Sequence, residues 1–412
     1  MPKTDLSEYK IEFSNFGKKA AITVGFGPGL FAADSAVFSH PLARLSAQLA
    51  AAGYDMPWRE SPPENSGIYK CLAALGFDKI VCYSETGRTQ VDCTFACADM
   101  NDGAEAFRLV FCCLVGSHHE QWYENFDSGT SPLHKGFEKS EAFAFEKLQQ
   151  FIAAADSGDK KLKFLITGHS RGGATANLLA AHLIRENLYT ANERVFAYTF
   201  AAPSCYSGAD RKDEKYRRIF NIIHEEDFVT RCMPRAWGYG RYGRTLALPN
   251  SRNCPDYAAV LAKTQRCYGE LTEGARYYPF KKGPATVDCM VKGVFGGVKT
   301  VEEYYGKTFR CGNRRLSVQQ YFSQSLCAVT GEKAGSPANK AGLQLLLKTA
   351  VNRLCYDKVF RAVADFFVFY EGLGGITKGK LSKNYFSFAH EMTSYCALLL
   401  AAEENQLKEE TQ

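Results

Sequence analysis

The stretch from Leu162 to Leu183, LKFLITGHSRGGATANLLAAHL, decides the fold of this chain. It opens with Phe164-Leu165-Ile166, an apolar run whose length and composition are typical of a buried strand. Small and apolar residues then recur at helical spacing: Ala174, Ala176, Leu178, Leu179, Ala180 and Leu183. The sequence therefore predicts a strand, a tight turn and a helix, with a Gly-x-Ser-x-Gly motif on the turn.

A serine on such a turn has a strained backbone and points its hydroxyl out of the sheet. Gly168 and Gly172 suit their positions because they face each other across the turn, where a Cβ would clash. The start of the helix beneath Ser170 favours developing negative charge. We predict that Gly168, His169 and Gly172 form a nucleophile elbow around Ser170. The alternative is a glycine-rich turn with an incidental serine.

Composition and charge are those of an ordinary globular chain. The 412 residues are 46% hydrophobic and 23% charged, which allows one large domain with insertions or two domains. The net charge of +6 is too mild for this length to propose nucleic acid as a partner. The N-terminus lacks the apolar core of a signal peptide, and no run is long enough to span a membrane. With 15 cysteines, an odd number, these features predict a cytoplasmic protein with free thiols. Prior removal of a signal peptide would make secretion the alternative.

Around the motif, the pattern of strands and helices predicts an α/β fold. Strands are expected at 79–83, 92–96, 107–115, 194–203 and 217–223, with helices over 42–53 and 138–155. The run 107–115 is almost wholly apolar, as in a strand that is covered on both faces. Residues 1 to about 75 are expected to form a peripheral N-terminal cap.

Two positions downstream of Ser170 complete a candidate catalytic set. Asp227 follows the second strand after that of the nucleophile, where an α/β-hydrolase places its triad acid. Glu226 is the alternative acid. The alternative to a catalytic role is that this segment is a solvated acidic loop. Among the 8 histidines, His390 is the good candidate by chain order, because the histidine of such a triad comes last. Its alternative is a histidine at a helix start.

The elbow resembles that of the lipase class 3 (fungal-type lipase) family. The family's usual form is GHSLGG, so Arg171 departs from a leucine and is similar to bacterial lipase-like members. That departure leaves the backbone N–H in place and is expected to alter what the pocket mouth attracts. In the family, a central strand ends in an Arg-Gly-Ser/Thr turn that supplies the oxyanion hole. Gly116-Ser117 matches this turn, while Val115 stands where the family has arginine.

Further parts of the chain resemble the same family. Asp227-Phe228-Val229, followed by Pro234, fits the family's acid segment, and Tyr395 resembles a tyrosine that follows the family's histidine. The resemblance covers about residues 80–240 and the last thirty.

The resemblance implies an α/β-hydrolase fold with a mostly parallel central sheet, covering helices and a large cap insertion. The core is expected in 1–234 and 385–412, the latter carrying His390. Residues 235–384 lose the strand–helix alternation and are expected to form the insertion, a cap or lid lobe. Within it, the segment WGYGRYGR (237–244) is expected to be a solvated loop or to meet an anionic head group.

The implied activity is that of a serine carboxylester hydrolase, similar to lipases and lysophospholipases. Ser170, Asp227 and His390 would form the triad, and Ser117 with the backbone of Arg171 would bind the oxyanion. Such a mechanism needs no metal or organic cofactor. The expected substrate is an acyl ester or lipid, met in transient contact with a membrane surface. A soluble small-ester or thioester hydrolase and a non-catalytic lipase-like binding protein are the alternatives. Acyl chain length, head group and oligomeric state are not determined by the sequence.

Overall fold

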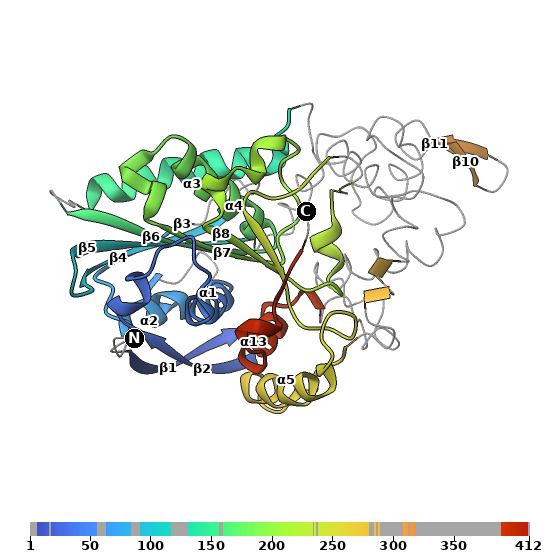
Figure 1. The fold of residues 1–412 in the computed structure, drawn as a ribbon, viewed down its shortest axis with the longest axis horizontal. Coiled ribbons are helices and arrows are strands. Elements are labelled where there is room, and N and C mark those ends of the chain that lie inside the picture. The colour runs from blue at the N-terminus through green and yellow to red at the C-terminus, as the bar shows by residue number, and fades with distance from the viewer. Residues whose placement is uncertain are drawn as a thin grey trace.

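The computed structural model describes residues 6–15, 18–55, 63–83, 91–116, 131–155, 160–233, 235, 238–279, 284–285, 287–288, 308–311, 314–317 and 389–410. The structural statements below concern these residues. They form a central sheet with helices on both faces (Figure 1).

The central sheet has eight strands in the order β12-β9-β8-β7-β6-β5-β4-β3. Its middle is parallel and consists of β5 (Ala106–Val115), β6 (Lys161–His169), β7 (Val195–Phe200), β8 (Ile219–Ile223) and β9 (Arg244–Ala247). The antiparallel edges are β3 (Lys79–Tyr83), β4 (Asp92–Asn101) and β12 (Lys408–Glu409). This mostly parallel sheet confirms the predicted α/β class.

Strand β5 shows why both faces must be covered, because successive side chains of a strand point to opposite faces. Its odd-numbered residues pack in one core with α1 (His40–Ala52), α2 (Gly67–Ala74), α5 (Tyr257–Leu271) and α13 (Met392–Ala401). Val110, Cys112 and Leu114 pack in a second core with α3 (Lys135–Ala154) and α4 (Arg171–Arg185). Figure 1 shows α3 and α4 on one side of the sheet and the other four helices on the opposite side.

Shorter elements complete the described part of the chain. Strands β1 (Ser7–Asn15) and β2 (Lys18–Phe26) form an antiparallel pair, as do β10 (Thr308–Cys311) and β11 (Arg314–Ser317). The 3₁₀ helices are Pro28–Phe31, Pro63–Asn65, Leu188–Glu193, Ala209–Lys212, Glu214–Tyr216, Phe228–Arg231 (η7) and Glu404–Gln406.

The expected division of the chain differs from the structure in two places. Helix α1 buries eleven of its thirteen residues, so the N-terminal region is built into the core and is not peripheral. Strand β9 and helix α5 lie in the range 235–384, which was expected to be an insertion, yet β9 pairs with β8 and α5 packs in the core. The core therefore extends at least to Leu271. Most of the remaining range lies outside the described residues, and its role as a cap or lid stays a prediction.

Candidate active site

Ser170 lies on the sharp turn between β6 and α4, with φ 57° and ψ −127°. This is an unfavourable region for a residue with a side chain. The flanking glycines permit it: a Cβ on Gly168 would lie 2.5 Å from the carbonyl oxygen of Gly172. A Cβ on Gly172 would lie 2.0 Å from the carbonyl oxygen of Leu114 in β5. The structure thus places Ser170 on a sharp strand-to-helix turn, and Gly172 also allows α4 to start directly against the neighbouring strand.

Ser170, His390 and Asp227 lie in one continuous hydrogen-bonded chain. The Nε2 atom of His390 is 2.9 Å from Ser170 Oγ, and its Nδ1 atom is 2.9 Å from Asp227 Oδ2. His390 and Asp227 are fully buried, and Ser170 retains 7% exposure. A carboxylate accepts hydrogen bonds and donates none. Nδ1 therefore carries the proton, which leaves Nε2 free to accept the hydroxyl proton of Ser170.

The acid in this hydrogen-bonded chain is Asp227, whose Oδ2 faces Nδ1 of His390. Asp227 follows β8 and caps η7, where its Oδ1 accepts from the backbone N–H of Val229 at 2.9 Å. Its Oδ2 accepts from the hydroxyl of Tyr395 in α13, also at 2.9 Å. Burial and the nearby Asp227 raise the pKa of Tyr395, so its hydroxyl remains a donor. These bonds hold the carboxylate in one orientation toward His390.

His169 turns away from the nucleophile and contacts the main chain of His390. Its Nε2 lies 2.8 Å from the carbonyl oxygen of His390, and its Nδ1 lies 2.6 Å from the hydroxyl of Tyr54. Burial, followed by the neighbouring His390, lowers the pKa of His169 well below its usual range. Sequence reasoning missed Tyr54, which follows α1. It lies 115 positions from His169 in the sequence, and no motif around it indicates this contact.

The sequence had suggested that Arg171 affects the mouth of a pocket, but the structure buries its side chain against α3. It is 3% exposed, and its guanidinium donates to the carbonyl oxygen of Gly136 and the hydroxyl of Ser140 in α3. It also lies over the ring of Phe137 at 5.6 Å. Arg171 therefore ties the start of α4 to the start of α3, while its backbone N–H stays at the helix N-terminus beside Ser170.

The segment around Arg241 is also buried, which corrects the expectation of a solvated loop or an anion-binding run. Arg241 is 3% exposed and donates to the carbonyl oxygens of Ala202 and Thr230. It thereby joins the loop after β7 to η7, the turn that begins at Asp227. The other predicted oxyanion residue, Ser117, lies outside the described residues.

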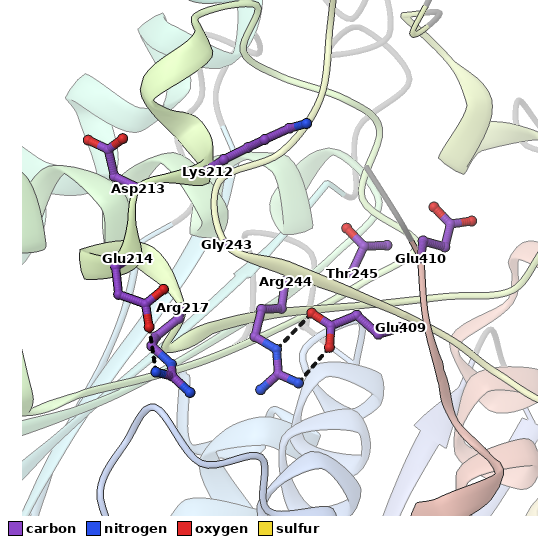
Figure 2. A pocket seen from close by; sticks show the side chains of 9 residues that line it. All are labelled: Lys212, Asp213, Glu214, Arg217, Gly243, Arg244, Thr245, Glu409 and Glu410. Carbon is purple, nitrogen blue, oxygen red and sulfur yellow. Dashed lines mark hydrogen bonds and ion pairs between the residues drawn. The ribbon is translucent and has the colours of Figure 1, made fainter.

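The structure also has an open cavity of about 700 Å³. Figure 2 shows the residues that line it. It sits near the amino ends of β8 and β9, whereas Ser170 and Asp227 follow the carboxyl ends of β6 and β8. Its lining charges are paired in part with each other, as Arg244 donates to both oxygens of Glu409 at 2.9 and 2.7 Å.

Two further searches concern the described part of the chain. No group of three or more His, Cys, Asp or Glu residues there is placed to hold a metal ion. No helix there has the length and apolar character needed to cross a membrane.

Comparison with known proteins finds sequence similarity to lipases. Residues 96–237 match the family model described as lipase (class 3). The secreted mono- and diacylglycerol lipase 1 of Fusarium solani is 26% identical over 128 residues, which is 29% of this chain and 37% of that relative. This chain therefore spans well under half the length of the curated relative that it matches.

Solved lipase structures also align with the chain. A triacylglycerol lipase with a serine protease triad as its catalytic centre aligns at 20% identity and TM-score 0.39, over 53% of this chain and 83% of that chain. The triacylglyceride lipase of Rhizomucor miehei aligns at 18% identity and TM-score 0.36, over 50% and 78%.

The family match and the structure cover different parts of the site. Ser170 and Asp227 fall within residues 96–237, whereas His390 lies beyond them and reaches both through the fold. Residues 96–237 of this chain are therefore similar to the class 3 lipase family.

Proposed function

We propose that this chain is a serine carboxylester hydrolase of the lipase or lysophospholipase type. The observation that carries the proposal is the buried chain from Ser170 Oγ through His390 to Asp227, with both contacts at 2.9 Å. The order serine, aspartate, histidine along the sequence is that of α/β-hydrolases. A non-catalytic binding protein would have no need of this aligned set.

Each residue of the triad has a defined task in this reaction. His390 takes the hydroxyl proton as Ser170 Oγ forms a bond to the ester carbonyl carbon, and Asp227 holds the imidazole in the required tautomer. The intermediate then expels the alcohol, which receives the proton from His390. Water attacks the acyl-enzyme with the same imidazole as base, and the bond between the acyl carbon and Ser170 Oγ breaks to release the acid.

The oxyanion of this reaction needs donors that are in place before the reaction. The backbone N–H of Arg171 is the proposed first donor, because it lies at the N-terminus of α4 directly after Ser170. Ser117 is the proposed second donor. Loss of one such donor typically costs about 10²- to 10³-fold in rate.

The proposed substrates are acyl esters of lipids, met at a lipid surface during transient contact. The family match and the mono- and diacylglycerol lipase that resembles this chain support this class. A soluble small-ester or thioester hydrolase is the alternative within the same chemistry.

The test is hydrolysis of p-nitrophenyl esters from acetate to palmitate, beside labelling of Ser170 by a fluorophosphonate. Ser170→Ala should abolish both. Ser46→Ala is the matched control, because this serine is also buried and its hydroxyl has no hydrogen-bond partner among the described residues. A long-chain optimum supports the lipid substrate, and a short-chain optimum supports the small-ester alternative. Wild-type chain without turnover or labelling would overturn the hydrolase proposal.

A cytoplasmic location is also a proposal. It is supported by eleven cysteines of the described residues that are all free thiols. Burial raises the pKa of Cys71 to about 12 and that of Cys205 to about 12, which suits unreactive thiols in a reducing compartment. Fractionation of the producing cells tests it, and recovery of the protein in the medium would contradict it.

A further inference from the structure

Two residues that the triad mechanism does not use form a hydrogen-bonded pair next to His390. His169 is the last residue of β6 and immediately precedes the nucleophile, while Tyr54 comes from the N-terminal region just after α1. Their side chains are hydrogen-bonded to each other, and His169 is also bonded to the main chain of His390. The rings of His169 and His390 lie 4.8 Å apart between centroids.

The proton positions in this arrangement follow from its partners. The carbonyl oxygen of His390 can only accept, so Nε2 of His169 carries a proton and donates it. Burial lowers the pKa of His169, so the ring is neutral and its Nδ1 is an acceptor. The Tyr54 hydroxyl therefore donates to Nδ1, and burial raises the pKa of Tyr54, so it keeps this proton. Two hydrogen bonds thus favour one tautomer of His169: Tyr54 donates to its Nδ1, and its Nε2–H donates to the carbonyl oxygen of His390.

We propose that Tyr54 and His169 act as a positioning pair that fixes the main chain of His390, so that its imidazole stays aligned between Ser170 and Asp227. The inference rests on the proposed hydrolase function. It assigns a role in the active site to residue 54, which lies outside the matched range 96–237.

Positioning matters here because of where His390 lies in the chain. It stands directly before Glu391, the N-cap of α13, and its own ring must stay within 2.9 Å of partners that follow β6 and β8. A hydrogen bond from His169 to the His390 carbonyl joins this segment to the end of β6, the same strand that carries the nucleophile. A displacement of about 1 Å in such a site can cost about 10²-fold in rate.

The neutrality of His169 has a second consequence. His390 becomes an imidazolium while the tetrahedral intermediate exists. A second positive charge at a centroid distance of 4.8 Å would oppose that step. By occupying Nδ1 with a donated hydrogen bond, Tyr54 favours the uncharged form of His169 and removes this opposition.

The experiment follows the rate constant for phosphonylation of Ser170 by a fluorophosphonate, which needs no knowledge of the substrate. Tyr54→Phe should slow labelling about 10-fold, the worth of one hydrogen bond of about 1.4 kcal/mol. His169→Leu should slow it about 100-fold. His169→Gln should recover most of the rate that His169→Leu loses, because its amide N–H can donate to the His390 carbonyl and its amide oxygen can accept from Tyr54. With p-nitrophenyl esters, these changes should appear in kcat and leave KM unchanged.

A matched control separates positioning from general stability. Tyr198→Phe removes another buried tyrosine hydroxyl, which accepts from the backbone N–H of Ser39 at 3.2 Å, away from the triad. It should lower Tm to a similar extent as Tyr54→Phe and leave the labelling rate unchanged. Equal slowing by Tyr54→Phe and Tyr198→Phe, or equal slowing by His169→Gln and His169→Leu, would overturn the proposal.

A second readout keeps the pair testable if the hydrolase proposal fails. In chain with ¹⁵N-labelled histidine, His169 should show the neutral Nε2–H tautomer, and Tyr54→Phe should keep that tautomer but shift the Nδ1 signal, because the hydrogen bond to Nδ1 is lost. If wild-type Ser170 is not labelled, the proposed function fails, and this spectrum alone decides whether the pair exists. A His169 signal in the Nδ1–H tautomer in the wild-type chain would refute the pair.

Discussion

Asp227→Asn should lower kcat by about 10³-fold or more, whereas Glu226→Gln should leave it close to wild type. The two changes are chemically matched: each removes one carboxylate charge from a side chain that is at most 1% exposed, at neighbouring positions. They differ in that the structure places Oδ2 of Asp227 2.9 Å from Nδ1 of the His390 imidazole, the position of a triad acid. The comparison therefore tests which of the two acids serves the triad.

The magnitude follows from what the carboxylate of Asp227 does. Its oxygens accept from three donors: His390 Nδ1, the Tyr395 hydroxyl and the Val229 N–H. An asparagine that keeps its oxygen toward His390 turns its NH₂ against the Val229 N–H, which costs about 1–3 kcal/mol of stability for a buried unpaired donor. It also removes the charge that stabilises the imidazolium. At a charge separation of about 4 Å and an effective dielectric constant of about 20, this is worth about 4 kcal/mol, or about 10³-fold in rate.

The opposite amide orientation is worse for catalysis. The NH₂ group then faces Nδ1 of His390 and forces its proton onto Nε2, where it can no longer accept from Ser170. Loss of the right tautomer in a triad of this kind costs about 10⁴-fold. Both orientations therefore place the expected loss between about 10³- and 10⁴-fold in kcat, with little change in KM.

The assay is turnover of the best p-nitrophenyl ester, with fluorophosphonate labelling as a check on Ser170 itself. Thermal unfolding of each variant shows that the chain remains folded at the assay temperature. The reasoning would be refuted if Glu226→Gln lost as much activity as Asp227→Asn, or if Asp227→Asn retained wild-type kcat.

Three further predictions follow from the described contacts. Gly172→Ala should lower the free energy of unfolding by at least about 3 kcal/mol and abolish labelling of Ser170, because its Cβ would lie 2.0 Å from the Leu114 oxygen. The control Gly269→Ala, with no neighbour within 3.4 Å, should not destabilise the chain. Arg171→Met removes buried bonds to α3 and should cost about 1–3 kcal/mol in the same measurement, yet retain kcat because the backbone N–H remains; a matching fall in kcat would contradict this. Burial and the nearby Arg44 lower the pKa of His40 to about 4, so the unfolded chain binds more protons than the folded chain between pH 6.5 and 4, and stability should fall as pH falls through that window. His40→Gln should flatten that part of the Tm–pH curve, and an unchanged slope would count against the assignment.

The elbow and the triad could be predicted because their requirements are either local or ordered along the chain. A positive φ at Ser170 and the close approach of Gly168 to Gly172 depend on residue types within five positions, although Gly172 also lies against Leu114 of β5. Asp227 and His390 follow from the chain order of the fold, which leaves few candidates. The alternation of buried residues in β5 likewise needs no knowledge of distant partners.

The features that were missed all depend on distant partners. The sequence RTLA becomes strand β9 because β8 and β12 pair with it on either side. Arginine is normally exposed, yet Arg171 and Arg241 are buried because backbone carbonyl oxygens of other segments accept hydrogen bonds from their guanidinium groups. No sequence pattern announces such acceptors in advance, and the same holds for Tyr54 and His169.

The histidine that completes the triad is held at several points by segments that the family match does not include. Arg44 of α1 donates to the carbonyl oxygens of Leu399, Leu400 and Ala402 at the end of α13, where a cation favours the helix terminus. Tyr268 of α5 bonds the side chain of Glu391, the N-cap of the same helix, at 3.2 Å. Helix α13 is therefore anchored at both ends, by α1 and by α5, and its start carries His390. Since α1, α5 and α13 all lie outside residues 96–237, the matched range supplies the proposed nucleophile and acid, while the remainder of the core fixes the proposed base against them.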